Sequence, residues 1–402
     1  MFFDVVVVGG GPAGSAAAIV LSKGGSSVLL IDKAEFPRDK CCGDGLTTMA
    51  LRLSEELGLD IEKLADFQTI DGAVIHSPSR RKNFFPLPDK GIYAAVVPRS
   101  DYDSALIDLA ISNGVEVKQK HKFISIDFGG RGAFVNIEGL ETVETSHVIA
   151  ADGAWSSVRR AVSNNSPQKN SNRGEWLAFR QYLSNVGPEA EKLHVWFEQD
   201  LLPGYAWSFP LPGARANVGF GVLRKNFSSS SDITKLSKNF LKRESLREVL
   251  GNNFETQDRL TAWPIPAQVG EKELAHGPVL FVGDAAAATD ILTGEGIGQA
   301  LLTGILAAKT LLTKESHHVS SLNYEKLVKS HLLSDHRMSK ILQSILAKPR
   351  GTEKALQFAA LNDWTKKNFA RWMFEDYPRA ILFTPKRWRK GVLKLPGAYT
   401  LD

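Results

Sequence analysis

Three glycines near the amino terminus have the spacing of a phosphate-binding loop. Gly9, Gly11 and Gly14 form a G-x-G-x-x-G pattern directly after a β-branched run, Val5 to Val8. In such a loop the first glycine allows a tight turn, and the second lets backbone N–H groups approach a pyrophosphate. The third lets helix and strand pack closely. The pattern therefore predicts a dinucleotide site, although a glycine-rich turn of an unrelated α/β fold would look alike.

The residues around the glycines strengthen this prediction. An alanine-rich helix is expected over Ser15 to Lys23, and its N-terminus supplies partial positive charge for phosphates. A second apolar run, Val28 to Ile31, ends at Asp32, whose carboxylate can accept hydrogen bonds from a ribose and disfavours a 2′-phosphate. This segment alone does not separate FAD from NAD.

The only two cysteines, Cys41 and Cys42, are adjacent in the stretch FPRDKCCGDGL. Across a trans peptide their Cα atoms lie about 3.8 Å apart, below the roughly 4.4 Å at which disulfides begin. A zinc site needs four ligands, and neither further cysteines nor a cluster of histidines supplies them. We therefore predict neither a redox pair nor a metal site here.

Two later segments place more chemistry at strand ends. Asp152-Gly153 follows one apolar strand, and Gly283-Asp284 follows another, Val279 to Val282. A carboxylate at Asp284 can accept hydrogen bonds from flavin ribityl hydroxyls, with a simple helix cap as the alternative. A helix that begins within Gly294 to Gly298 can aim free N–H groups at the N1/C2 carbonyl edge of a flavin, with a flexible loop as the alternative.

The order of these motifs resembles the para-hydroxybenzoate hydroxylase-type flavoprotein superfamily and, within it, the geranylgeranyl reductase family. VVPRSDYDSALIDLA is similar to the superfamily's Arg-containing segment, and RDKCCG to the family's Arg-x-Lys-x-Cys-Gly segment. PGYAWSFP, which starts at Pro203, is similar to the family's P-x-Y-x-W-x-F-P pattern, allowing one residue of spacing. LTGEG has the family's form, with Ile291 in place of a proline. The resemblance extends over about Met1 to Leu312.

The resemblance implies FAD as the cofactor and gives a set of site residues. The predicted cofactor-binding residues are Gly9, Gly11, Pro12, Ala13, Gly14, Asp32, Lys33, Arg38, Cys42, Gly43, Arg99, Asp152, Gly153, Gly283, Asp284, Gly294, Gly296 and Ile297. The predicted catalytic residues are Cys42, Tyr205, Trp207 and Glu295, with Asp290 as a further candidate proton donor. No metal is predicted.

The family's reaction is the reduction of isolated prenyl double bonds. An unactivated alkene cannot accept hydride directly, so protonation with hydride delivery from flavin N5 is expected, in a dry pocket lined by aromatic faces. The implied substrate is an isoprenoid lipid, chlorophyll or quinone precursor, and the implied electron donor is NADPH or ferredoxin.

Two alternatives stay open at this stage. YAWSFP is close to the W-x-W-x-I-P motif of FAD-dependent halogenases, so a halogenase or hydroxylase acting on an aromatic or natural-product scaffold is the competing enzyme class. A flavin-binding relative without turnover is the non-enzymatic alternative, which the intact phosphate and flavin motifs disfavour.

The length of 402 residues predicts two closely packed domains, and a hydrophobic content of 43% is that of a globular protein. The motifs and the resemblance imply a mixed α/β fold class. We expect a Rossmann-like FAD-binding domain with an inserted antiparallel-sheet substrate domain and a C-terminal helical region. The predicted segments are 1–66, 99–160 and 275–315 for the FAD-binding domain, 67–98 and 161–274 for the substrate domain, and 316–402 for the helical, basic and aromatic region.

Cysteine usage and the lack of a signal-like start or an apolar run of membrane-spanning length predict a cytoplasmic protein. The C-terminal region mixes tryptophans with lysines and arginines, which indicates either a solvated basic face or a peripheral contact with anionic membrane. A nucleic-acid role is not expected, since no binding fold accompanies the charge.

Overall fold

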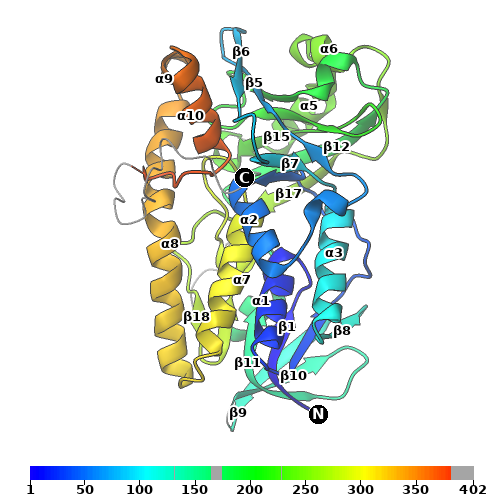
Figure 1. Cartoon of the computed structure of the whole chain (residues 1–402), viewed down its shortest axis with the longest axis vertical. Helices are drawn as coiled ribbons and strands as arrows, with labels where there is room; N and C mark the ends of the chain where they lie inside the picture. Colours follow the sequence, from blue (N-terminus) through cyan, green and yellow to red (C-terminus); the bar gives the residue numbers. More distant parts are fainter. Residues whose placement is uncertain (131, 164–173, 228, 382–402) are drawn as a thin grey trace.

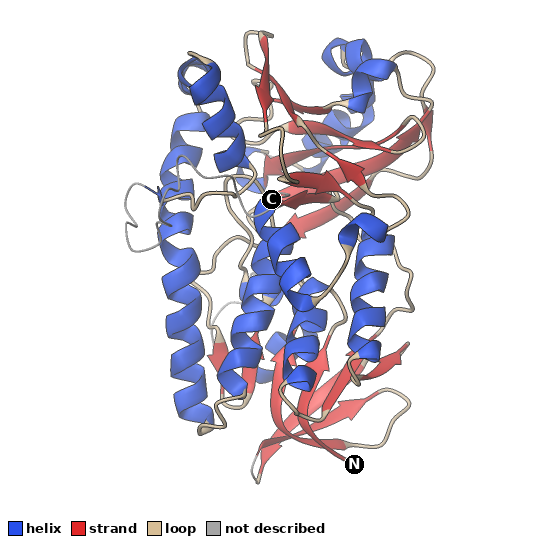
Figure 2. Cartoon of the chain, in the orientation of Figure 1, coloured by secondary structure: helices blue, strands red, loops and turns tan. Residues whose placement is uncertain are grey.

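Two strand-rich regions lie at opposite ends of the long axis of the molecule, with helices between them. The computed structural model describes residues 1–130, 132–163, 174–227 and 229–381. Figure 2 shows the strands gathered toward the two ends, and Figure 1 places helices α1, α2, α3 and α7 in the layer between them.

The first sheet is mostly parallel and contains the glycine-loop strand at its centre. Its order is β18-β19-β11-β1-β2-β8, and the hairpin of β9 and β10 joins it through β11. The strands are β1 (Phe2–Val8), β2 (Val28–Asp32), β8 (Glu116–Gln119), β9 (Phe123–Gly129), β10 (Gly132–Ile137), β11 (Val143–Ala150), β18 (Ala275–His276) and β19 (Val279–Phe281). The predicted Rossmann-like arrangement is confirmed, because β19, β11, β1, β2 and β8 pair in parallel.

The second sheet is antiparallel except where β13 pairs with β5 in parallel. Its order is β16-β12-β15-β14-β13-β5-β6, with β17 also paired to β12. The strands are β5 (Gly72–His76), β6 (Lys82–Pro86), β12 (Trp176–Ser184), β13 (Leu193–Trp196), β14 (Ala206–Leu211), β15 (Arg215–Leu223), β16 (Glu255–Thr256) and β17 (Thr261–Ile265). Segments from both sides of β11 in the sequence therefore build one sheet.

A small sheet connects the two regions. It consists of β3 (Gly45–Thr47), β7 (Ala94–Val96) and β4 (Gln68–Thr69), all paired antiparallel. Because β3 begins two residues after Gly43, this sheet fixes the position of the cysteine-containing loop relative to both large sheets.

The helices cover the faces of these sheets. They are α1 (Pro12–Lys23), α2 (Thr48–Leu57), α3 (Arg99–Ser112), α4 (Ser157–Ser163), α5 (Ser230–Asn239), α6 (Glu244–Leu250), α7 (Ile297–Leu311), α8 (His317–Leu346), α9 (Pro349–Ala359) and α10 (Asp363–Met373). Short 3₁₀ turns are η1 (Ile61–Lys63), η2 (Pro188–Glu191), η3 (Arg224–Asn226), η4 (Phe240–Lys242) and η5 (Gly283–Ala286). Among the described residues, no helix combines the length and apolar character needed to cross a bilayer.

The antiparallel sheet has a buried layer on each face. Ala206 and Phe220 pack with α6 on one face, whereas Phe85 and Leu211 pack with α9 and α10 on the other. Since side chains alternate along a strand, Tyr205, which precedes β14, has its ring on the second face. That face is the one turned toward the loops at the end of the parallel sheet.

Candidate cofactor and substrate site

The glycine loop leaves β1 at the carboxyl edge of the parallel sheet, and two of its positions accept only glycine. Gly9 has φ +108°, and a Cβ there would lie 2.4 Å from the carbonyl oxygen of Ala151. A Cβ on Gly14 would lie 1.9 Å from the carbonyl oxygen of Gly9. Pro12 and Ala13 form the first turn of α1, whose N-cap Gly11 offers no side-chain cap. The turn is thus shaped to receive a phosphate group.

A Cβ built on Gly11 would have its nearest contact 3.6 Å away, at the Arg38 Nη2 atom, so space remains above this residue and a cation lies beside it. Asp32, at the end of β2, accepts hydrogen bonds from the Gly10 N–H (2.7 Å) and the Ala34 N–H (2.8 Å). A carboxylate has about four acceptor positions, so Asp32 retains capacity for a ribose hydroxyl. Lys33 is exposed.

One buried carboxylate brings two predicted arginines together. Arg99 donates through Nε and Nη2 to the two oxygens of Asp103, each at 2.7 Å, and Arg38 Nη2 lies 3.2 Å from Asp103 Oδ2. Asp103 is fully buried. The sequence indicated only that Asp103 lies in the helix after Arg99. The structure shows that Asp103 holds both guanidinium groups in place.

The cysteine loop lies against these arginines. Burial raises the pKa of the Cys42 thiol, and the Arg99 guanidinium acts in the opposite direction. Cys41 is turned elsewhere, because its Sγ donates to the carbonyl of Thr261 at 3.4 Å. The two cysteines are both free thiols and have different surroundings.

The two strand-end aspartates differ in their contacts. Asp152 Oδ2 accepts from the Ser157 N–H (2.6 Å), the Ser157 hydroxyl (2.9 Å) and the Val158 N–H (3.1 Å), so it caps α4. Gly153 beside it has φ +78°. Asp284 is half-buried and accepts from the Thr289 hydroxyl at 3.2 Å. Each carboxylate keeps one oxygen for a further partner, because the contacts of Asp152 all use Oδ2 and leave its buried Oδ1 without a hydrogen bond, and Asp284 accepts from Thr289 through Oδ1.

The first amides of α7 are not free, contrary to the sequence-based expectation. Glu295 Oε1 accepts from the N–H of Ile297 (2.9 Å) and of Gly298 (3.1 Å). A carboxylate just before a helix satisfies the unpaired N–H groups and the positive end of the dipole, which is the physical reason for the difference. Gly296 is the N-cap, and Gly294 has φ +70°.

The C-terminal segment after α10 supplies two residues that the sequence did not indicate. Glu375 accepts from the Thr47 hydroxyl (2.9 Å) and the Gln299 side-chain amide (2.8 Å). Arg379 Nη2 lies 3.7 Å from Glu375 Oε1, and its Nε lies 3.5 Å from Asp290 Oδ2. Burial raises the pKa of Glu295, and the charge of Glu375 raises it further, so the two carboxyl groups act on each other.

Four aromatic rings run in a row beside these loops. The centroids are 6.0 Å apart for Phe197 and Tyr205, 6.1 Å for Tyr205 and Trp207, and 6.1 Å for Trp207 and Phe209. The Tyr205 hydroxyl donates to the carbonyl of Thr293, in the loop before α7. A Cβ on Gly43 would lie 3.1 Å from the Phe209 ring. This aromatic row therefore lies against both the cysteine loop and the α7 loop.

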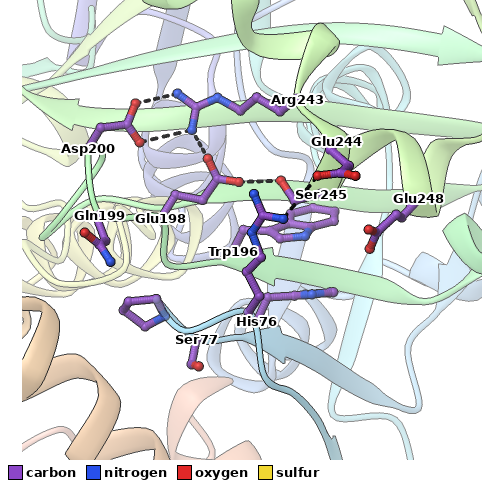
Figure 3. A pocket seen from close by; sticks show the side chains of 12 residues that line it. His76, Ser77, Trp196, Glu198, Gln199, Asp200, Arg243, Glu244, Ser245 and Glu248 are labelled. Carbon is purple, nitrogen blue, oxygen red and sulfur yellow. Dashed lines mark hydrogen bonds and ion pairs between the residues drawn. The ribbon is translucent and has the colours of Figure 1, made fainter.

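A separate pocket lies at the outer end of the antiparallel sheet. It encloses about 370 Å³ and is lined by His76, Trp196 and the Glu198–Arg243 ion pair, among others (Figure 3). Figure 3 shows Arg243 held by two acidic side chains and so already neutralised. The flavin motifs contribute none of its lining residues, so we do not assign the chemistry to it.

The fold and the strand-end motifs define a flavin-binding oxidoreductase of the Rossmann type. The chain belongs to the FAD binding domain family, which it matches over residues 3–365. It is an FAD-dependent enzyme, and the glycine turn, the Arg38 cation and the Asp32 carboxylate fit that cofactor.

Curated relatives confirm the resemblance to isoprenoid reductases. The menaquinone reductase of Mycolicibacterium smegmatis is 31% identical, over 80% of this chain and 79% of the relative. A digeranylgeranylglycerophospholipid reductase of Methanopyrus kandleri is 32% identical over 70% of each chain. One from Methanocaldococcus jannaschii is 29% identical over 79% of this chain and 81% of its own.

Solved structures share the fold. A geranylgeranyl bacteriochlorophyll reductase-like protein of Thermoplasma acidophilum has a TM-score of 0.74 at 24% identity, covering 98% of both chains. The flavin-dependent brominase Bmp2 has a TM-score of 0.74 at 18% identity, over 96% of this chain and 98% of the other. At these identities the likeness concerns the architecture alone.

Proposed function

We propose that this enzyme is an FAD-dependent reductase that adds hydrogen across isolated C=C bonds in the isoprenoid chain of a quinone or lipid. The observation that carries the proposal is the aromatic row against the cysteine loop and the α7 loop. The row offers apolar ring faces to a long hydrocarbon chain beside groups that hold protons. The names of the curated relatives support the same substrate class.

The strand-end residues have separate roles in holding FAD. Gly11 and the first turn of α1 receive the pyrophosphate, with Arg38 beside them, and Asp32 accepts from the adenosine ribose. Asp284 would accept a hydrogen bond from the ribityl chain. The chemistry that FAD would supply here, when bound and reduced, is the hydride for one carbon of the double bond.

The other carbon needs a proton, and four candidate donors can be compared. The Tyr205 hydroxyl already donates its hydrogen to Thr293, and Asp290 uses both oxygens as acceptors, from Leu292 and Ser339 among others. Glu295 uses Oε1 as an acceptor, and its raised pKa keeps a proton on Oε2 at neutral pH. A carboxylic acid is also a stronger acid than the Cys42 thiol, whose pKa is raised as well. We therefore assign the proton to Glu295.

Two further side chains assist this step. As positive charge develops on the alkene, the indole face of Trp207 and the phenol face of Tyr205 stabilise it. The Arg99 guanidinium lies beside Cys42, so positive charge on an alkene carbon next to this thiol would be repelled. The Cys42 loop therefore acts mainly as a wall of the site. Reducing equivalents come from NADPH or ferredoxin, as the sequence resemblance implies.

The test is a reaction under anaerobic conditions with chemically reduced enzyme. Menaquinone and geranylgeranylated glycerophospholipids are offered separately, and the products are analysed by mass spectrometry. The proposal expects a gain of about two mass units for each double bond reduced, since one hydride and one proton are added. Reoxidation by oxygen alone, with halide or an oxygen atom incorporated into an aromatic acceptor, would overturn the proposal in favour of a halogenase or hydroxylase.

A further inference from the structure

The connection between α9 and α10 exposes three large apolar side chains within seven residues. Phe358 is 71% exposed, Leu361 65% and Trp364 62%. These side chains are not needed to pack α9 on the core, because Leu356 and Ala359 are the residues of α9 that are buried there. We call residues 348–367 the α9–α10 tip. Adjacent large apolar groups left in water at one place on a surface mark an interaction site.

The charges around these side chains are mainly positive. The tip contains Lys348, Arg350, Lys354, Lys366 and Lys367, against Glu353 and Asp363. Both acidic groups are engaged within the chain: Glu353 accepts from the Ser79 hydroxyl at 2.9 Å, and Asp363 lies 4.0 Å from Lys366. Aromatic and aliphatic side chains surrounded by lysine and arginine suit the interface of an anionic bilayer. There, burial of the apolar side chains and attraction of the basic ones to anionic headgroups both favour binding.

The tip is also coupled to the site by a short rigid element. Helix α10 extends over 11 residues, about 16 Å at 1.5 Å per residue, from the tip to Met373. It is anchored on the antiparallel sheet by Phe369, whose ring centroid lies 5.0 Å from that of Phe85. The residues that follow place Glu375 and Arg379 beside the α7 loop. A surface docked at the tip is therefore one helix length from the proton-holding groups.

We propose that the α9–α10 tip is the surface through which the enzyme docks on an anionic lipid bilayer, with Phe358, Leu361 and Trp364 inserted at the headgroup level. The charge of the tip selects an anionic bilayer over a second, similarly basic copy of this chain. The inference deepens the proposed function, because it names where the enzyme meets its lipid. Vesicle binding needs no turnover, so failure of one proposal is distinguishable from failure of the other.

The test is vesicle flotation with the full FAD-loaded chain. One set of vesicles is phosphatidylcholine alone, and the other contains about 30% phosphatidylglycerol. The test variant carries Phe358→Ser, Leu361→Ser and Trp364→Ser. The matched control carries Ile124→Ser, Phe128→Ser and Leu322→Ser, which are also exposed but lie on β9 and the first turns of α8, at the other end of the long axis (Figure 1).

The expected result is binding of wild type and control to the anionic vesicles and a loss of at least about tenfold in the partition coefficient of the test variant. A second variant, Lys354→Glu with Lys367→Glu, keeps the apolar side chains of the tip but reverses two of its positive charges, so it should lose binding to anionic vesicles. If the triple variant retains no FAD, this double variant tests the proposal in its place. Wild type that stays off anionic vesicles, or a triple variant that binds as wild type does, overturns the proposal.

Two further measurements distinguish the bilayer from other partners of the tip. A wild-type dimer in sedimentation velocity that becomes monomeric in the triple variant, with vesicle binding unchanged, would make the tip an interface between copies. Binding lost on deletion of residues 382–402 but kept in the triple variant would assign the contact to the C-terminal residues. Either result overturns the bilayer proposal.

Discussion

The indole N–H of Trp207 donates to the side-chain oxygen of Asn217 at 3.0 Å. Asn217 is fully buried on β15, and its amide nitrogen donates to the carbonyl of Cys42 (2.8 Å) and to Asp44 Oδ2 (2.7 Å). One side chain therefore connects the aromatic row to the cysteine loop. Through it, the antiparallel sheet and the segment that follows β2 hold each other in register.

The first prediction concerns this connection. Asn217→Ala removes the acceptor of the Trp207 indole N–H and one of the two donors to Asp44, the other being the Tyr182 hydroxyl, which should lower the free energy of unfolding by about 1–3 kcal/mol. Because Trp207 then shifts relative to the site, turnover should fall by about ten- to a hundredfold while FAD stays bound. Urea unfolding, FAD absorbance and anaerobic turnover measure the three quantities. The control is Asn136→Ala on β10, and equal effects of the two variants would contradict the role given to Asn217.

The second prediction is a pH dependence of stability that originates at Asp44. Burial raises the pKa of this fully buried carboxyl from an ordinary 3.8 to about 6, although Tyr182 and Asn217 donate hydrogen bonds to it. A raised pKa means that folding favours the protonated acid. The stability from this group is therefore complete below pH 4 and is lost as the pH rises through about 6, on the order of 3 kcal/mol in all.

Asp44→Asn removes the titrating group and keeps an acceptor for Tyr182. The variant should lack the fall in unfolding free energy between pH 4 and 7 that wild type shows, and it should be the more stable protein at pH 7. Urea unfolding across that pH range provides the comparison, with the exposed Asp108→Asn as control. If wild type and Asp44→Asn have parallel stability profiles, Asp44 does not titrate as described.

The third prediction separates the two strand-end aspartates. Asp284→Ala removes the acceptor assigned to the ribityl chain, so the purified protein should lack FAD. Asp152→Ala removes a cap that accepts three hydrogen bonds from the start of α4, which should lower the free energy of unfolding by about 1 kcal/mol with FAD retained. The ratio of flavin to protein absorbance and urea unfolding distinguish the two. Stoichiometric FAD in Asp284→Ala would show that the motif is misassigned.

The parts of the site that were predictable from sequence are local in the chain. The glycine turn, Asp32 and the start of α7 each depend on a strand, a turn and a helix that follow one another, so spacing alone indicates them. The buried connectors are different. Asn217 meets Cys42 across 175 residues, and Tyr182 meets Asp44 across 138. No periodic pattern marks such pairs, because they exist only after two sheets have formed.

The C-terminal region is a second case in which the sequence did not indicate the contacts of the site. Its basic and aromatic composition predicted a solvated or membrane-facing surface, yet Glu375 and Arg379 turn inward to the α7 loop. A buried ion pair and an exposed one have the same composition, so only the fold distinguishes them. The basic stretch after Ile381, on which much of that prediction rested, lies outside the described residues.

The last prediction tests the proton assigned to Glu295. Since its pKa is raised, turnover should persist above the ordinary pKa of a carboxyl and fall as the pH rises through the raised value, where the proton is lost. Glu295→Gln cannot donate a proton and should reduce turnover by about 10²–10⁴-fold with FAD retained. Cys42→Ser should lower it far less, because the loop remains in place.

Glu375→Gln gives this assignment its sharpest test. The charge of Glu375 is one cause of the raised pKa of Glu295, so removing that charge lowers the pKa of Glu295. The alkaline fall in turnover should then move to lower pH, whereas Glu62→Gln on the surface should leave it in place. The rate of flavin reoxidation by the prenylated substrate, followed anaerobically from pH 5 to pH 9, measures the shift. A profile that Glu375→Gln leaves unmoved would mean that the proton comes from another group.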